Sequence, residues 1–276
     1  MDLHAALHCL HLSSPDPAGA ARFYAGIYDM AVEAVGDGFW CRGPARQLAI
    51  SPGAANQLHY AQFALADEAA WAAFLTRAES LPCQPLPPQF IGPADAICLQ
   101  DPDGHALVFS SPIAPQHVAA TRPLPSVTLQ HFAWRTQQLP AMLDFYTTQL
   151  GFVLSDAVRD DEGTLRACFL RSDHLHHALA LFFAPVSCFD HQSYEAPDWA
   201  GMRTWGDHMA ALREPIVWGI GRHGPGNDVF FMVRDPDGTL AEISAEIEHC
   251  EPDRPAGLWP HEERTLNLWG KAILRS

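Results

Sequence analysis

Histidine is the residue type whose number most suggests chemistry in this chain. The 276-residue sequence contains 15 histidines. Histidine titrates near neutral pH and also binds metal ions well. Histidines scattered over a surface would need no function, so only their positions can distinguish a metal or acid–base site from surface decoration.

Cysteine provides neither a disulfide framework nor a thiolate metal site. The seven cysteines are scattered along the chain, and none is in a Cys-x-x-Cys pair, the spacing that thiolate zinc sites commonly use. The N-terminus has no basic segment followed by an apolar one, and no apolar run approaches the roughly 18 residues of a membrane span. We therefore expect a protein of the reducing cytoplasm, with no membrane partner.

The charge excludes another class of partner. The chain has 32 acidic residues against 17 lysines and arginines, a formal net charge of −15. Nucleic acid requires a basic surface, so we expect no nucleic-acid partner. Hydrophobic residues make up 48% of the chain, which is enough to form the core of one large domain or of two ordinary ones.

Two landmarks occur twice, in the same order. A Phe-Tyr pair near the end of an amphipathic helix lies at 23–24 and again at 145–146. An Asp-Pro-Asp-Gly sequence follows much later, at 101–104 and at 235–238. Proline presets φ and glycine accepts positive φ, so each of these sequences predicts a turn between two strands. Ordered repetition of both landmarks indicates a tandem duplication.

The periodicity predicts similar elements around the landmarks of each half. We expect an N-terminal half at 1–112, a proline-rich linker at 113–125, a second half at 126–248 and a C-terminal tail at 249–276 that packs on the domain. Strands are expected at 10–12, 47–51, 59–65, 96–99, 106–110, 129–132, 167–170, 177–183, 191–195, 229–233 and 240–244, and helices at 17–28, 68–80, 139–150 and 205–212.

This order of elements resembles the vicinal oxygen chelate superfamily, whose members are built from paired βαβββ modules. Two tandem halves further resemble the type I extradiol ring-cleavage dioxygenases. The resemblance covers roughly residues 5–248 and implies an α+β fold. In that fold each half is a pair of βαβββ modules that form a curved mixed sheet around a central pocket.

The resemblance also implies one metal site, in the second half. Family members bind the metal through a histidine on the first strand, a histidine on a middle strand and a glutamate seven residues after the first Asp of the turn. These positions correspond to His131, His191 and Glu242. Two imidazoles and one carboxylate leave coordination positions open and suit Fe(II), with Mn(II) as the alternative.

The first half provides an internal comparison. Its corresponding positions are Cys9 and Val108, and His59 is the one residue there that resembles the middle ligand. Because this set lacks a carboxylate, we expect the first half to bind no hard metal ion.

Two more histidines match family landmarks. The resemblance assigns His177 to proton transfer near the metal, although its His neighbours would also suit a surface cluster. His223, in a glycine-rich stretch, matches the histidine that contacts or deprotonates a substrate hydroxyl. Glycines beside it would let the backbone approach a ligand closely.

The expected substrate contacts are less regular. Trp134, Phe182 and Trp218 are expected to form an apolar wall for an aromatic ring. Met232 stands where relatives often have a tyrosine that hydrogen-bonds the substrate. Tyr194 is a candidate for the replacement donor, and the alternative is that it is a packed core aromatic.

Together these residues predict an Fe(II)-dependent extradiol dioxygenase. Such an enzyme inserts O2 into a catecholic aromatic ring next to the vicinal hydroxyls, gives a ring-opened product, and is expected here as a homo-oligomer. One alternative is a metal-dependent isomerase, lyase or hydrolase of the same superfamily that consumes no O2. The other is a non-catalytic module that binds a small molecule.

Overall fold

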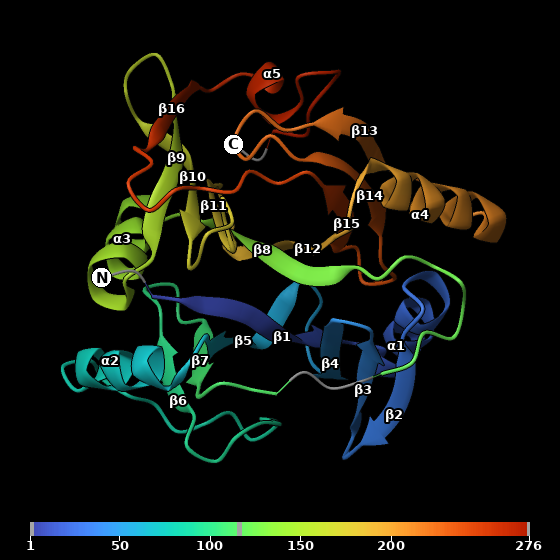
Figure 1. The fold of residues 1–276 in the computed structure, drawn as a ribbon, viewed down its shortest axis with the longest axis horizontal. Helices are drawn as coiled ribbons and strands as arrows, with labels where there is room; N and C mark the ends of the chain where they lie inside the picture. The colour runs from blue at the N-terminus through green and yellow to red at the C-terminus, as the bar shows by residue number, and fades with distance from the viewer. Residues whose placement is uncertain (1–2, 115–117, 275–276) are drawn as a thin grey trace.

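Two mixed β-sheets, one from each half of the chain, pack on a shared core (Figure 1). The computed structural model describes residues 3–114 and 118–274, so residues 115–117 of the expected linker lie outside the described part. The first sheet has seven strands in the order β2-β3-β4-β1-β5-β7-β6. The second has nine, in the order β13-β14-β15-β12-β8-β11-β10-β9-β16. The expected α+β class is confirmed.

Capping residues define the two helices of the first half. Asp16 accepts from the amide of Gly19 at the start of α1, and Asp67 accepts from Ala70 at the start of α2, as aspartate commonly does at the N-cap. The elements of this half are β1 (Ala5–Ser14), α1 (Pro17–Ile27), β2 (Ala31–Val35), β3 (Gly38–Gly43), β4 (Arg46–Pro52), β5 (Gln57–Leu65), α2 (Glu68–Ala78), β6 (Ile97–Gln100) and β7 (Ala106–Ser110).

The second half repeats this order and adds elements at its end. Its helix α3 continues directly into a π-helical segment, η1. The elements are β8 (Thr128–Thr136), α3 (Leu139–Asp144), η1 (Phe145–Leu150), β9 (Val153–Arg159), β10 (Leu165–Arg171), β11 (Leu179–Phe183), β12 (Cys188–Glu195), α4 (Trp199–Leu212), β13 (Trp218–Arg222), β14 (Val229–Arg234), β15 (Leu240–Ala245), β16 (Gly257–Pro260) and α5 (Glu263–Leu266).

Strand pairing confirms the duplication. In both halves the first strand pairs in parallel with the fourth strand of its module, as β1 does with β4 and β8 with β11. The two modules of a half join through an antiparallel pair, β1 with β5 and β8 with β12. Among the described residues, the second module of the first half has one strand fewer, with only a single bridge from Gln84 to Cys98.

Several elements differ from the sequence expectation. Strand β2 was not expected because four of its five residues are exposed and show no apolar alternation. The glycine-rich stretch at 218–222, where no strand was expected, is an edge strand, and α4 begins six residues earlier than expected. The tail adds β16 to the second sheet, in parallel with β9.

Alternation along the strands of the second sheet separates two environments. On β8, Phe132 and Trp134 belong to the core shared by the two halves, while Ala133 belongs to a separate apolar cluster on the opposite face. The same alternation places Ile243 in the shared core and Leu240 in the opposite cluster. Any site on that opposite face therefore uses every second residue of its strands. No helix in the described part of the chain is long and apolar enough to span a bilayer.

Candidate active site

The three expected metal ligands converge on the face of the second sheet that is turned away from the shared core. His131 lies on β8, His191 on β12 and Glu242 on β15, three neighbouring strands. One potential ligand atom from each lies within 4.8 Å of the other two, and all three residues are buried. The Nε2 atoms of the two histidines are 3.3 Å apart.

Neighbouring polar groups orient these side chains. Nδ1 of His131 contacts Oε1 of Gln130, and Nδ1 of His191 lies 2.6 Å from Oδ1 of Asp190. Both partners are acceptors, so each ring carries its proton on Nδ1 and points an unprotonated Nε2 toward the centre. Ser193 donates to Oε1 of Glu242 at 3.0 Å. Such secondary contacts are typical of metal-binding histidines and carboxylates.

The protonation states also suit a cation. Burial lowers the pKa of His131 to about 3, although Glu242 acts in the opposite direction. Burial alone would raise the pKa of Glu242, but the nearby His223 and His131 lower it overall. The group therefore offers a neutral imidazole from His131 and a carboxylate from Glu242, whose Oε2 has no hydrogen-bond partner in the described part of the chain. His191 adds an Nε2 atom that faces Nε2 of His131. These donors fit a divalent ion such as Fe(II) or Mn(II).

A small apolar pocket opens beside the three ligands. Its free volume is about 20 Å³, which is enough for about one water molecule. Both expected acid–base histidines and three of the expected substrate contacts line it. The lining residues are His131, Phe169, His177, Ala180, Phe182, His191, Trp218, His223, Pro225, Met232 and Leu266.

His177 lies directly beside the first ligand. Its ring centroid is 4.3 Å from that of His131, and its Nδ1 is 3.0 Å from Nδ1 of His176. Burial, and then the neighbouring His131, hold the pKa of His177 well below its usual value. His177 is therefore a neutral imidazole that could accept a proton from a bound molecule.

His223 lies on the other side of the pocket and is less buried. Its Nδ1 donates to the carbonyl of Leu266 at 2.6 Å, and its Nε2 is 3.9 Å from Oε2 of Glu242. Burial alone would lower the pKa of His223, but Glu242 and Asp228 raise it overall. The ring stacks on Phe230 with centroids 3.8 Å apart, which fixes its plane.

Asp228 is a buried acid that the sequence reasoning missed. With His223 and Glu242 it forms a second group of potential ligand atoms within 4.8 Å of one another. Burial raises the pKa of Asp228 to about 8, so its carboxyl favours the neutral form at pH 7. A neutral carboxyl is a poor metal ligand, which makes His131, His191 and Glu242 the better metal group.

Trp134 and Tyr194 do not reach the pocket, and their expected role as substrate contacts is corrected here. Trp134 is three residues after His131 on the same strand, and Tyr194 is three after His191. An odd separation places side chains on opposite faces of a strand. Both belong to the shared core, where Tyr194 packs 4.9 Å from Tyr28.

The corresponding position in the first half is filled by apolar side chains. By register, Cys9 corresponds to His131, and Val108 corresponds to Glu242. The counterpart of the middle ligand His191 is Tyr60 and not His59. His191 lies two residues before Ser193, which pairs with both His131 and Glu242. Tyr60 likewise lies two residues before Gln62, which pairs with both Cys9 and Val108. Tyr60, Cys98 and Val108 form a small buried cluster. Within the described residues, the potential metal groups lie in the second half alone.

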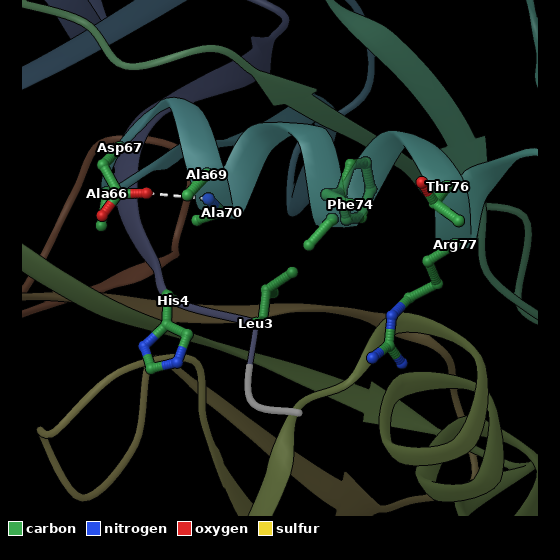
Figure 2. Close-up of a pocket in the computed structure, with 10 residues that line it drawn as sticks. Leu3, His4, Ala66, Asp67, Ala69, Ala70, Phe74, Thr76 and Arg77 are labelled. Carbon is green, nitrogen blue, oxygen red and sulfur yellow. Dashed lines mark hydrogen bonds between the residues drawn. The ribbon is translucent and has the colours of Figure 1, made fainter.

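A much larger cavity lies elsewhere, between helix α2 and the start of β1 (Figure 2). It has a volume of about 590 Å³. Its polar lining residues include His4, Asp67 and Arg77, but Asp67 already caps α2 through the amide of Ala70. It contains none of the converging histidines, so its size does not make it the candidate site.

The residues that orient the ligands were also missed by sequence reasoning. Gln130 and Asp190 each directly precede a ligand histidine, and Ser193 follows His191 by two positions, on the same face. The last of these could have been found from strand alternation alone. The contacts of Gln130 and Asp190 with the histidine that follows each of them depend on side-chain rotamers, which residue spacing does not predict.

Known proteins resemble the second half of the chain in sequence and nearly the whole chain in fold. Residues 128–243 match the family described as the Glyoxalase/Bleomycin resistance protein/Dioxygenase superfamily. Metapyrocatechase 2 of Cupriavidus necator is 34% identical over 150 residues, which are 52% of this chain and 45% of that protein. The match thus spans less than half the length of this curated relative.

Solved structures extend the similarity to the whole chain at the level of the fold. The Mn(II)-bound glyoxalase from Novosphingobium aromaticivorans is 20% identical, with a TM-score of 0.82 over 100% of this chain and 93% of that one. Homoprotocatechuate 2,3-dioxygenase from Arthrobacter globiformis is 22% identical, with a TM-score of 0.81 over 98% and 88%. The match to this superfamily therefore covers the C-terminal half of the chain, and the solved structures share the fold over nearly the whole chain.

Proposed function

We propose that this protein is a metal-dependent extradiol dioxygenase that uses Fe(II) and O2 to open a catecholic ring next to its vicinal hydroxyls. The observation that carries the proposal is the convergence of His131, His191 and Glu242 beside an apolar pocket that also contains His177 and His223. The sequence similarity to a metapyrocatechase supports the same reaction class.

In this proposal His131, His191 and Glu242 hold the ion. Their donor atoms are buried and converge, and the pKa shifts of His131 and Glu242 leave those two residues in the forms that bind a divalent cation. When bound, the ion supplies positive charge and open coordination positions on which a chelating substrate and O2 can be oriented.

The remaining pocket residues bind the substrate and handle its protons. His177, neutral and next to His131, accepts a proton from a substrate hydroxyl and can return it. Nε2 of His223 is available to hydrogen-bond a substrate oxygen, since its Nδ1 is already engaged by Leu266. Phe182, Trp218 and Met232 pack against the ring and exclude water.

A second candidate is a metal-dependent isomerase or lyase that consumes no O2. Two observations favour it: the fold matches that of a Mn(II)-bound glyoxalase over the whole chain, and the pocket has the thioether of Met232 where ring-cleaving relatives often have a tyrosine hydroxyl. Such an enzyme would use the same three ligands and prefer a different substrate.

Oxygen uptake separates the two candidates. The purified protein, loaded with Fe(II) or with Mn(II), is mixed with catechols, aminophenols and hydroquinones in an oxygen electrode while metal content is measured. The dioxygenase requires one metal ion per chain and O2 consumption in step with a ring-opened product. Product formation without O2 uptake would favour the second candidate.

Variants at two glutamates complete the test. Glu242→Gln should lose the metal ion and the activity, because it removes the only carboxylate of the three-ligand group. Glu262→Gln is the matched control, since Glu262 is exposed and lies on the C-terminal segment. Retention of metal by the Glu242 variant would contradict the ligand assignment.

A further inference from the structure

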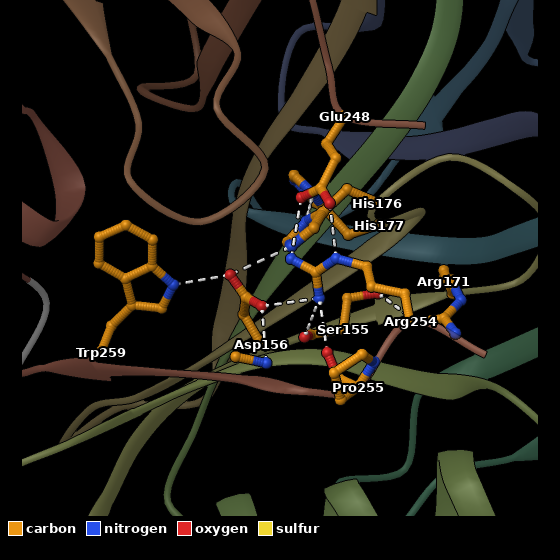
Figure 3. A network of polar contacts seen from close by, with 10 residues as sticks. Ser155, Asp156, Arg171, His176, His177, Glu248, Arg254, Pro255 and Trp259 are labelled. Atoms are coloured by element: carbon orange, nitrogen blue, oxygen red, sulfur yellow. Dashed lines mark hydrogen bonds and ion pairs between the residues drawn. The ribbon is translucent and has the colours of Figure 1, made fainter. Parts of the chain in front are cut away.

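A buried acid–histidine pair lies directly behind His177. His176, on the loop before β11, is fully buried, and its Nδ1 is 3.0 Å from Nδ1 of His177. Its other nitrogen, Nε2, is 3.2 Å from Oδ2 of Asp156 on β9. Asp156, His176 and His177 therefore form a continuous polar line that ends at the pocket (Figure 3).

Asp156 is surrounded by donors from the C-terminal segment. Oδ1 accepts from the amide of Gly257 and from Nη1 of Arg254, each at 3.1 Å. Oδ2 accepts from the indole of Trp259 at 2.7 Å. Burial alone would raise the pKa of Asp156, but His176, Trp259 and Arg254 lower it overall. The group is thus a carboxylate, which can only accept hydrogen bonds.

Arg254 is itself fixed. It forms two bonds to the carboxylate of Glu248, at 2.6 and 2.8 Å, and a third to the carbonyl of Ser155 at 2.7 Å. The carbonyl of Glu248 in turn accepts from the amide of His176 at 2.9 Å. The segment at 248–259 therefore fixes the carboxylate of Asp156. It also fixes the backbone of His176, which faces that carboxylate.

The order of donors and acceptors determines where the protons lie. Nε2 of His176 lies at an ion-pair distance of 3.2 Å from Oδ2 of Asp156, and because a carboxylate can only accept, this contact favours a proton on that nitrogen. In a neutral ring Nδ1 of His176 then has none and must accept from Nδ1 of His177. His177 is left with an unprotonated Nε2, the form that can take a proton from a substrate.

We propose that Asp156 and His176 are positioning residues that hold His177 in the tautomer with an unprotonated Nε2, and that Arg254, Gly257 and Trp259 keep Asp156 in place for this purpose. The proposal rests on the function proposed above, in which His177 accepts the substrate proton. It extends that function to a buried pair outside the pocket and to the C-terminal segment.

Close packing around the pair leaves little freedom for another arrangement. Gly226 has φ of +79°, and a Cβ there would lie 3.1 Å from Nδ1 of His176 and 3.3 Å from Cε1 of His177. A Cβ on Gly257 would lie 2.4 Å from Oδ1 of Asp156. Backbone without a side chain thus approaches the two histidine rings and the Asp156 carboxylate closely, which leaves these groups little room to turn.

Histidine tautomers can be read directly by NMR. The probe is the protein labelled with ¹⁵N-histidine and loaded with Zn(II), a diamagnetic ion, with the His177 signals assigned by comparison with His177→Asn. Long-range ¹H–¹⁵N correlations then report which ring nitrogen carries the proton. The proposal requires Nδ1–H and a bare Nε2 on His177. A proton on Nε2 in the unmodified protein would overturn it whatever the variants do.

Asp156→Asn provides the decisive change. An amide has one acceptor oxygen, which we expect to stay with its two donors Arg254 and Gly257. Its NH2 then replaces Oδ2, which loses the bond from the indole of Trp259, and faces His176. His176 must then accept at Nε2 and donate from Nδ1, and His177 must move its proton to Nε2. We expect an inverted tautomer and a kcat lower by about 100-fold, with little change in KM, because proton transfer and not binding is affected.

A control of the same type lies in the first half. Asp101 is a buried aspartate whose Oδ2 is 2.8 Å from Nδ1 of His105. Asp101→Asn should leave the His177 tautomer and kcat unchanged. If the Asp156 variant keeps the original tautomer and full activity, the positioning role is wrong while the proposed function stands. If the unmodified protein consumes no O2 with any substrate, the proposed function fails, and the tautomer measurement still decides the role of the pair.

Discussion

The hydroxyl of Tyr24 in the first half donates a hydrogen bond of 2.9 Å to Oδ2 of Asp235 in the second. The reverse bond also exists, from Tyr146 of the second half to Asp101 of the first, at 3.0 Å. Each joins the Phe-Tyr pair of one repeat to the Asp-Pro-Asp-Gly turn of the other. The two landmarks that reveal the duplication in the sequence are therefore the residues that connect its halves.

The buried carboxyl group of Asp235, which accepts this bond from Tyr24, should make stability depend on pH. Burial raises the pKa of Asp235 to about 6, and the Tyr24 hydroxyl acts against that rise. An unfolded aspartate releases its proton near pH 4, so this group favours the folded state below that pH and loses its contribution as the pH rises through about 6.

Tyr24→Phe should therefore lower the free energy of unfolding more at high pH than at low pH. Above pH 7 it removes the donor to Oδ2 of a buried carboxylate, whose Oδ1 keeps the amides of Asp237 and Thr239, at about 1.5 to 3 kcal/mol. Near pH 4.5 it removes a hydrogen bond to a neutral carboxyl, at about 0.5 to 1.5 kcal/mol. Urea unfolding of both proteins at pH 4.5 and pH 8 measures the difference. An equal loss at the two pH values would contradict the raised pKa.

The sequence predicted the repeat and the ligand group because both depend on order along the chain. His131, His191 and Glu242 occupy fixed places relative to strands and turns, so their convergence follows from the fold. Trp134 and Tyr194 were placed by residue type, without regard to strand alternation, and lie on the other face. The contacts behind His177 come from segments about 100 residues apart, such as 156 and 254–259, which no local pattern connects.

The hydroxyl of Ser193 should strengthen metal binding. It donates to Oε1 of Glu242 at 3.0 Å and lies 3.0 Å from the Ser244 hydroxyl. Ser193→Ala removes the donor that orients the carboxylate, and we expect metal affinity to fall by about 10- to 100-fold. Competition with a chelator measures it. Ser110→Ala, at the position in the first half that corresponds to Ser244, should leave the affinity unchanged.

Two buried aromatics should behave differently because they lie on opposite faces of the sheet. Phe182→Ala removes part of the pocket wall. We expect KM for catechol to rise about tenfold, which corresponds to a loss of about 1.4 kcal/mol of binding free energy. Trp134→Phe alters the shared core and should lower the free energy of unfolding by about 1 to 3 kcal/mol without changing KM. A higher KM in the Trp134 variant would place that residue back in the pocket.

Leu266 should control which rings the pocket accepts. The free volume of about 20 Å³ is bounded by Leu266, whose carbonyl accepts from His223, so a ring can bind only if the covering residues give way. Leu266→Ala removes several of these atoms and keeps the backbone carbonyl. We expect the ratio of kcat/KM for 3-substituted catechols to that for catechol to rise about tenfold, as a change of a few carbon atoms in an apolar pocket commonly allows. Leu258→Ala is the matched control, because Leu258 lies on the same C-terminal segment and is 70% exposed. An unchanged ratio in the Leu266 variant, with the control also unchanged, would mean that the substrate enters from another side of the pocket.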